Sequence, residues 1–380
     1  MSKTPSTHSK QPNHTNIPLV DAQLKQNPHA LAQWIKAQAR DLGFADCGIA
    51  KPDAHDQIAH LQNYLDKGHH ADMGYLAQNL DKRADPTLLV PNTKSIICVR
   101  MDYLMQKPAH RYVPHVPNHA IIARYARGRD YHKVVRSRLK QLAKRIEEKV
   151  GTFESRPFAD SAPIFEKALA EKSGLGWTGK HTLLINKNAG SFFFLGELFT
   201  SLELPFDQPA SAHCGTCVAC IDICPTQAII APYQVDARRC IAYLTIEYQG
   251  IIPEEFRQPI GNRVFGCDDC QLICPWNGFS QLSLESDFKA RHSLDNIHLL
   301  DLWQWTETEF LSNTEGSAIR RTGYQGFMRN VAIGLGNADF DPAIIAALQR
   351  SQHDDVVQVH VDWAIQQQQT KAHKISFSQN

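Results

Sequence analysis

The sequence lacks the features of an exported or membrane-spanning protein. No apolar run approaches the roughly 18 residues that a membrane-spanning helix needs. The first residues, MSKTPSTHSKQPNHTNIPLV, contain neither the apolar core of a signal peptide nor a twin-arginine pair. We therefore expect a cytoplasmic protein with no membrane contact.

Two further absences narrow the class of protein. There is almost no excess of charge, with 40 Lys and Arg against 39 Asp and Glu, so a polyanionic partner would have to meet a local patch. No G-x-G-x-x-G follows a predicted strand, which argues against a dinucleotide-binding Rossmann domain. What remains is a globular composition, 43% hydrophobic over 380 residues, with room for about two or three domains.

Hydrophobic periodicity predicts an α+β fold for the first half of the chain. Apolar residues recur at helical spacing over 30–44 and 131–150, and compact apolar runs predict strands at 46–50 and 94–104. The stretch 180–198 is typical of a hairpin around an Asn-Ala-Gly turn. Because strands and helices interleave without a regular βαβ rhythm, we expect α+β architecture.

Changes in composition divide the chain into five segments. They are a disordered polar segment at 1–27, an α+β domain at 28–205, a cysteine-rich domain at 206–285, a helical domain at 286–366 and a polar tail at 367–380. The helical domain contains three helical stretches with short breaks, which look like one and a half units of a HEAT-like repeat.

Eight of the ten cysteines fall into two groups. The first group has gaps of two, two and three residues before a Cys-Pro pair, in HCGTCVACIDICPTQAI (213–229). Three closely spaced cysteines supply three corners of a 4Fe-4S cluster, and the fourth cysteine ligates the other cluster. Zinc is the competing interpretation, but its ligands usually form two separated C-x₂-C pairs or Cys/His mixtures.

The second group, GCDDCQLICPWN (266–277), lacks its first ligand, because Val264 stands where the spacing calls for a cysteine. Cys240 is the candidate replacement. One predicted cluster is thus held by Cys214, Cys217, Cys220 and Cys274, and the other by Cys224, Cys240, Cys267 and Cys270. The remaining Cys47 and Cys98 lie in apolar runs and are expected to be buried thiols.

Two clusters pass single electrons but select no substrate, so the residues before them must bind the acceptor. Here the sequence resembles a known family. YARGRDYH (125–132), FADSAP (158–163) and IGNRVFGCDDCQ (260–271), together with the cysteine block, resemble the epoxyqueuosine reductases from about 30 to 365. The resemblance implies a cobalamin-dependent enzyme that reduces the epoxide of epoxyqueuosine in the tRNA anticodon to the alkene of queuosine.

The resemblance also implies an architecture and partners. It suggests an N-terminal cobalamin-binding α+β domain, a ferredoxin-like domain with two 4Fe-4S clusters, and C-terminal HEAT-like helices. We expect a monomer that receives single electrons from an external flavodoxin or ferredoxin system. Asp130 and His132 begin the D-x-H-x-x-G motif of another class of cobalamin protein, but Val135 occupies the glycine position, so we reject cobalt ligation there.

By the same resemblance, Asp160 is the proton donor and contacts the cofactor. From the residues alone, Asp160 before Ala162-Pro163 also fits a helix N-cap. The implied cobalamin contacts, besides Asp160, are Arg83, Ala123, Leu184, Leu195 and Ala242. Without the family, each of these would be an ordinary packing residue.

A basic stretch is the candidate tRNA contact. Residues 121–150 contain ten Lys and Arg and three acidic residues, which is compatible either with phosphate binding or with a solvated helix face. Arg320, Arg321 and Arg329 are further candidates. Three alternatives to the reductase remain: a corrinoid dehalogenase, a ferredoxin-type electron carrier, and a tRNA-binding module with structural clusters.

Overall fold

The computed structural model describes residues 21–108 and 116–378. The disorder predicted for residues 1–20 therefore concerns a segment outside the described residues. Within the predicted disordered segment, α1 (Ala22–Lys25) is a short helix capped by Asp21, whose backbone N–H donates to Lys149 O at 2.8 Å. This cap and contact order the end of the segment.

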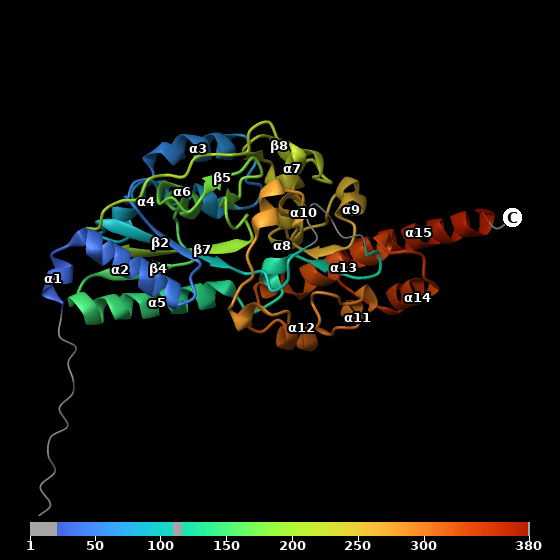
Figure 1. Cartoon of the computed structure of the whole chain (residues 1–380). Helices are drawn as coiled ribbons and strands as arrows, with labels where there is room; N and C mark the ends of the chain where they lie inside the picture. The colour runs from blue at the N-terminus through green and yellow to red at the C-terminus, as the bar shows by residue number, and fades with distance from the viewer. Residues whose placement is uncertain (1–20, 109–115, 379–380) are drawn as a thin grey trace, which may run out of the picture.

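A four-stranded antiparallel sheet forms the centre of the N-terminal half. Its strand order is β1 (Asp46–Ala50), β2 (Ser95–Asp102), β7 (Phe193–Thr200), β4 (Ser155–Phe158). Successive residues of β2 belong alternately to two apolar clusters, because helices cover both faces. Figure 1 shows α2 (Pro28–Asp41) and α5 (Tyr131–Val150) on one face and α6 (Glu166–Lys172) on the other.

The predicted helices and strands of this half are confirmed, because their local signals agree with their packing. Asn27 caps α2 and accepts from Ala30 N, with Pro28 in the first helical position. Asp130 caps α5 in the same way, and Gly151 ends it with a φ of 82°. Both helices bury an apolar stripe against the sheet.

The hairpin predicted over 180–198 is wrong. The turn exists, with Asn186 N–H donating to Gly190 O at 2.7 Å. However, β6 (Leu184–Ile185) pairs with β5 (Trp177–Thr178), whereas β7 pairs with β2 and β4. Since β7 is an inner strand with both edges occupied, no edge remains for β6.

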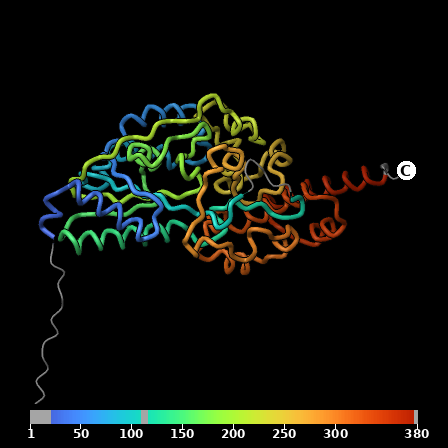
Figure 2. Tube along the Cα trace, viewed as in Figure 1, coloured from blue at the N-terminus to red at the C-terminus, as the bar shows by residue number. Residues whose placement is uncertain are grey.

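A second core joins an early segment to the C-terminal half. Strand β3 (Ile121–Ile122) runs parallel to β10 (Arg263–Phe265), and Ala120, Ile122 and Ala126 pack among residues from 237–364. Figure 2 shows this blue-green part of the trace lying among orange and red segments. Besides the helices of the cysteine segment and the last three helices of the chain, the structure has α3 (Ile58–Asp66), α4 (Leu80–Ala84), α11 (Leu299–Trp303) and α12 (Glu307–Asn313).

The cysteine-rich segment consists of short elements. These are α7 (Ala219–Asp222), β8 (Ile229–Ala231), β9 (Gln234–Val235), α8 (Ile241–Ile246), α9 (Glu254–Ile260) and α10 (Asp269–Leu272). The short helices α7 and α10 each lie inside a cysteine group, and they contact one another. The two cysteine blocks are therefore brought together in space.

Three helices end the chain: α13 (Gly323–Asn337), α14 (Pro342–Arg350) and α15 (Asp355–Ser378). They coincide with the three predicted helical stretches. The predicted polar tail from 367 is polar but helical, since α15 runs on to Ser378. Its Gln368 is fully buried and donates to Leu335 O at 2.8 Å and Ala338 O at 3.1 Å, which ties the helix to the end of α13. Among the described residues, no helix is both long and apolar enough to cross a membrane.

Candidate active site and cluster-binding cysteines

Asp160 lies in the loop between β4 and α6, with its side chain 62% exposed. Its φ of 46° is left-handed, a conformation uncommon for residues other than glycine. The hydroxyl of Tyr131 donates a short hydrogen bond to Oδ2 of Asp160, and Nε2 of His132 lies 3.7 Å from the same oxygen. Tyr131 and His132 are the first two residues of α5, so this helix presents both to the carboxylate.

The alternative role of Asp160 as a helix cap is wrong. Helix α6 begins at Glu166, its cap position is Phe165, and no side chain caps it. Ile164 N–H bonds to Ala162 O, so Asp160 stands several residues before the helix and has no free helical N–H within reach. The Asp160 carboxylate is thus not used as a helix cap and is available for chemistry in the exposed loop.

His132 is held by Asp130. Nδ1 of His132 lies 2.7 Å from Asp130 Oδ1, and the same carboxylate oxygen accepts from His132 N. Burial disfavours the imidazolium, but the hydrogen bond and charge of Asp130 outweigh it and raise the pKa of His132 above its ordinary 6.5. In the sequence, YARGRDYH supported only the family resemblance, and Tyr131 and His132 had no assigned role. Asp130 and His132, which stand two positions apart, are the sequence signal that could have indicated this pair.

The site opens toward residues from the C-terminal half. Burial raises the pKa of Tyr75, and the nearby carboxylates of Glu247 and Asp160 raise it further. Arg321 forms an ion pair with Glu247 at 2.8 Å and also lies within electrostatic range of Asp160. Residues from both halves of the chain therefore lie within electrostatic range of Asp160.

The first predicted group of cysteines surrounds one cavity. Cys214, Cys217, Cys220 and Cys274 line a cavity of about 280 Å³. Within the described residues, no group of three or more His, Cys, Asp or Glu is spaced for a single metal ion. Burial raises the pKa of Cys220 to about 11, as expected of a thiol whose negative charge has no cation beside it. Four thiols around a cavity fit a 4Fe-4S cluster, whose irons bind thiolates.

The second predicted group consists of four half-buried cysteines. Burial raises the pKa of Cys270, and then Cys240, Cys220 and Cys224 lie close enough to raise it electrostatically. Burial likewise raises the pKa of Cys267, with a smaller effect from Cys270. Cysteines of both predicted sets therefore lie near Cys270. Cys47 and Cys98 are confirmed as buried free thiols on β1 and β2.

The predicted cobalamin contacts lie on several elements of the fold. Leu184 and Leu195 share an apolar cluster with Ala162 of the Asp160 loop. Ala123 borders the second cysteine group, because a Cβ built on Gly266 would lie only 2.7 Å from the Cβ of Ala123.

The other two contacts come from short helices. Ala242 follows Cys240 at the start of α8. Arg83 of α4 donates to the carbonyls of Gln78 and Tyr75. Apolar surface and backbone of this kind are compatible with contacts to a large, flat cofactor.

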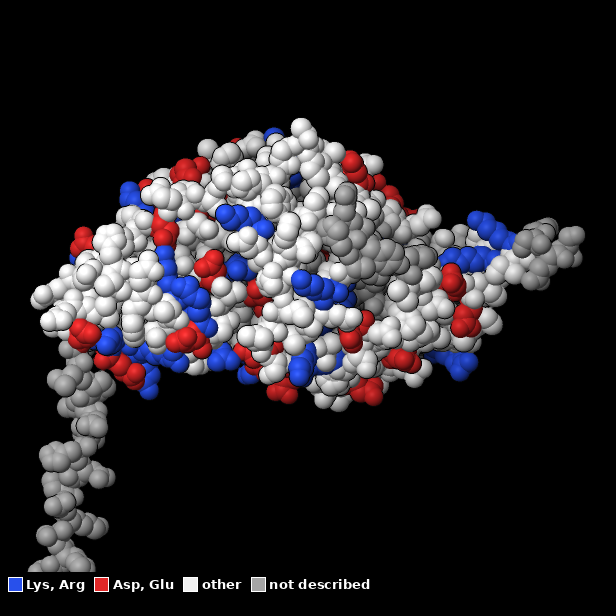
Figure 3. Space-filling model, viewed as in Figure 1, with Lys and Arg blue, Asp and Glu red and all other residues white. Residues whose placement is uncertain are grey.

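The basic residues of 121–150 do not form one unbroken patch. Arg124 pairs with Asp268 at 3.0 Å, Arg129 with Asp287 at 2.8 Å and Arg138 with Glu285 at 2.6 Å. Figure 3 shows red and blue side chains interspersed along the lower edge, where α5 lies. Lys133, Lys140 and Lys144 remain exposed.

Arg329 is wrong as a tRNA contact. It is completely buried in α13 and donates to Leu244 O, Tyr248 O and Gly250 O at 2.8–2.9 Å. A guanidinium that satisfies three carbonyls inside a core is structural. Arg320 is exposed, and Arg321 is exposed but paired with Glu247.

The fold and the cysteine pattern define an oxidoreductase with an iron–sulfur domain. A family model described as a 4Fe-4S double cluster binding domain matches residues 213–277, and one described as epoxyqueuosine reductase QueG, DUF1730 matches 83–161. The curated epoxyqueuosine reductase of Pseudomonas aeruginosa is 52% identical over 354 residues, which cover 92% of this chain and 98% of that protein. The chain belongs to the epoxyqueuosine reductase family.

Other relatives agree. The epoxyqueuosine reductase of Escherichia coli is 51% identical over 339 residues, covering 89% of each chain. The solved structure of the Streptococcus thermophilus enzyme has a TM-score of 0.81 at 29% identity, covering 89% of this chain and 90% of that one. A crystal structure of epoxyqueuosine reductase with an epoxyqueuosine-modified tRNA-Tyr stem loop has a TM-score of 0.81 at 27% identity, with the same coverage.

Proposed function

We propose that this chain reduces epoxyqueuosine to queuosine in the anticodon loop of tRNA, with Asp160 as the proton donor. Family membership supports the reaction, the last step of queuosine formation. The observation that carries the site assignment is the contact of Asp160 with Tyr131 and His132 in an exposed loop. An exposed carboxylate beside a histidine with a raised pKa can take up a proton from the imidazolium and pass it on as a general acid.

The stoichiometry of the reaction requires more than one acid. Converting an epoxide to an alkene and water consumes two electrons and two protons. Asp160 protonates the departing oxygen, and His132 supplies the second proton, because its Nε2 lies 3.7 Å from Asp160 Oδ2 and its raised pKa favours the imidazolium. Tyr131 keeps the Asp160 carboxylate oriented.

Cobalamin is the cofactor that the family implies, and the residues around Asp160 fit it. Arg83, Ala123, Leu184, Leu195 and Ala242 would hold it, mainly through backbone and apolar surface. When bound, it would supply the low-potential reducing centre at the epoxide carbon. The chain's own contribution is to position the nucleoside, exclude water and deliver protons from Asp160 and His132.

Two 4Fe-4S clusters on the predicted cysteine sets would carry electrons inward. Cys217 of the first set is exposed, so an external flavodoxin or ferredoxin has access to that cluster. The second set lies against Ala123, a proposed cofactor contact. Electrons would therefore enter at Cys214, Cys217, Cys220 and Cys274 and leave from Cys224, Cys240, Cys267 and Cys270.

The tRNA would approach the exposed Asp160 loop. Lys133 on the first turn of α5 and Arg320 near Arg321 are the exposed basic residues best placed to contact phosphates. We assign residues 28–205 to the cobalamin-binding domain, 206–285 to the ferredoxin-like domain and 286–366 to a HEAT-like domain. We expect a monomer that works in the cytoplasm, where tRNA is modified.

Anaerobic reconstitution with iron, sulfide and cobalamin tests this proposal. The loaded enzyme, a chemical reductant and epoxyqueuosine-containing tRNA should yield queuosine by mass spectrometry of digested nucleosides. Asp160→Asn should load the same iron and cobalamin but form no product, whereas Asp66→Asn, at an exposed site on α3, should behave as the parent. Full activity of Asp160→Asn would contradict the role of Asp160.

A further inference from the structure

Two carboxyl groups lie beneath the Asp160 loop. Glu166, the first residue of α6, accepts the backbone N–H of Asp160 through Oε1 at 2.5 Å. Glu197 lies on the inner strand β7, directly opposite Phe158 of β4, and is completely buried. The two carboxyls are neighbours, since each changes the pKa of the other.

The carboxylate of Glu197 has no hydrogen-bond donor of the usual N–H or hydroxyl kind. Among the residues that the structure describes, no N–H or O–H group other than a protonated Glu166 carboxyl reaches its carboxylate oxygens. An unpaired buried carboxylate costs several kcal/mol, so such groups are nearly always paired or protonated. Because its neighbour is another carboxyl, the pair is satisfied only when a proton lies between them.

The protonation behaviour of the pair agrees with this geometry. Burial, followed by the charge of Asp160, raises the pKa of Glu166 to about 8. Burial and then Glu166 raise the pKa of Glu197 well above its ordinary range. The other titratable or charged groups that face the pair are Asp160 from its loop, Tyr131 and His132 from α5, Cys98 from β2 and Lys167 from α6. None of them donates to Glu197.

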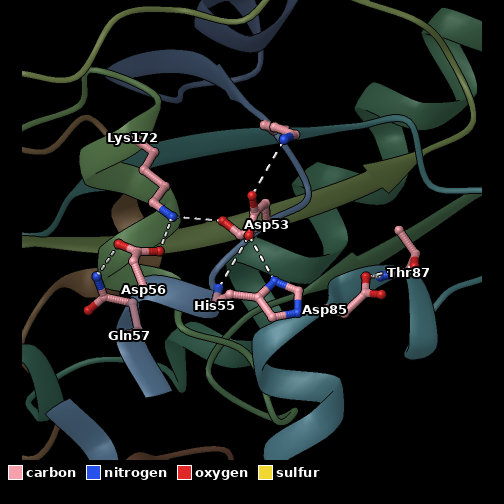
Figure 4. A network of polar contacts seen from close by, with 8 residues as sticks. Asp53, His55, Asp56, Gln57, Asp85, Thr87 and Lys172 are labelled. Carbon is pink, nitrogen blue, oxygen red and sulfur yellow. Dashed lines mark hydrogen bonds and ion pairs between the residues drawn. The ribbon is translucent and has the colours of Figure 1, made fainter. Parts of the chain in front are cut away.

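The Asp160 loop needs such a support. A left-handed φ at a residue other than glycine costs on the order of 1 kcal/mol and persists only when its surroundings hold it. Glu166 can hold the loop because α6 is fixed at its other end. Lys172 donates to Asp53 O at 2.8 Å and forms a short ion pair with Asp56 (Figure 4).

We propose that Glu166 is a positioning residue for Asp160, and that it holds the Asp160 loop through a carboxyl that shares a proton with Glu197. This inference rests on the proposed role of Asp160. It gives a function to the buried carboxyl of Glu197 and the half-buried carboxyl of Glu166, which are kept side by side at a cost in stability. The pair does not touch the substrate. It sets where the Asp160 carboxyl stands relative to Tyr131 and His132.

Three variants separate this role from a merely structural one. Glu166→Gln keeps an oxygen for Asp160 N–H and adds an amide donor for Glu197, so its single-turnover rate should stay close to that of the parent. Glu166→Ala removes the acceptor and should lower that rate at least about tenfold, with unchanged tRNA affinity, iron and cobalamin. Glu148→Gln, at an exposed site on α5, is the matched control.

Glu197→Gln tests the shared proton without measuring activity. Between the ordinary carboxyl pKa of 4.5 and about 8, the folded protein binds more protons at this pair than the unfolded chain does. The stability of the parent should therefore fall as pH rises through this window. The melting temperature of Glu197→Gln should exceed that of the parent by a margin that grows toward about pH 8. If the melting temperatures of both proteins depend on pH with the same slope, the shared proton is contradicted.

The outcomes distinguish this inference from the proposed function. An inactive Asp160→Asn with a fully active Glu166→Ala would overturn the positioning role alone. An active Asp160→Asn would overturn the role of Asp160 itself, whatever the Glu197 melting curves show. Lower melting temperature of Glu166→Ala with an unchanged rate per loaded molecule would also contradict positioning, because a structural residue affects folding but not turnover.

Discussion

The phenol of Tyr131 donates to Oδ2 of Asp160 while its ring stacks on Phe194, with centroids 4.1 Å apart and planes 1° from parallel. The stack fixes the ring against a residue of β7, so the core sets the position of the hydroxyl. Burial, followed by the charge of Asp160, raises the pKa of Tyr131 far above its ordinary 10. Tyr131 therefore remains a donor at any working pH.

Tyr131→Phe should keep the ring stack and lose the hydrogen bond. Because a hydrogen bond to a charged group contributes about 1.5–3 kcal/mol, we expect the single-turnover rate to fall by roughly 10- to 100-fold. Cobalamin and iron loading should not change. Tyr233→Phe, at an exposed tyrosine remote in sequence, is the control. A parental rate in Tyr131→Phe would show that this bond does not orient Asp160.

Asp130→Asn should shift the pH dependence of the reaction. Asp130 is the main partner that raises the pKa of His132 against the opposing effect of burial. The imidazolium is present below this pKa, so activity should fall as pH rises through it. With a neutral amide in place of the carboxylate, the pKa of His132 falls, and the alkaline limb of the pH–rate profile should move to lower pH. An unmoved limb would exclude His132 as the second acid.

Substitution of one cysteine ligand should remove about half of the bound iron. Two 4Fe-4S clusters contain about eight irons, so Cys274→Ser and Cys240→Ser should each lose about four. The double variant should lose nearly all iron, because the two residues belong to different clusters. Iron analysis and electron paramagnetic resonance of anaerobically purified protein measure this. A double variant that retains half its iron would place both cysteines on one cluster, while Cys98→Ala should retain all of it.

Two arginines near one another in sequence should behave differently. Arg329→Met leaves three buried carbonyls without a donor and should destabilise the protein by about 3 kcal/mol or more. Arg320→Ala should leave the melting temperature unchanged and weaken tRNA binding, more so at low salt. Thermal melting and filter binding separate the two effects. Normal stability of Arg329→Met would contradict its structural role.

Much of this structure could be predicted from local patterns. The helices over 28–41 and 131–150 have caps, apolar stripes and terminating residues that all favour the same boundaries. The cysteine sets could also be predicted, because cubane geometry restricts which spacings can close a cluster. In both cases the determinants lie within a few residues of one another.

The predictions that failed depended on distant partners. Asn-Ala-Gly specified a turn, but pairing of β7 with β2 and β4 decided where the next strand went. Arg329 resembled a surface residue in sequence, and its carbonyl partners lie about 80 positions away. The importance of Glu197 was equally hidden, since only the folded sheet brings it against Glu166. Long-range contacts of this kind leave no periodic signal.

In the proposed assignment, the first cluster takes three ligands from 214–220 and its fourth from position 274, while Cys224, at the end of the first block, would belong with the later set. A nascent chain that has emerged only as far as the first block therefore possesses no complete binding site for inorganic iron and sulfide. Maturation must wait until both blocks have left the ribosome and met. Metal loading is thereby coupled to correct tertiary assembly, and prematurely terminated chains would be unable to accumulate redox-active fragments.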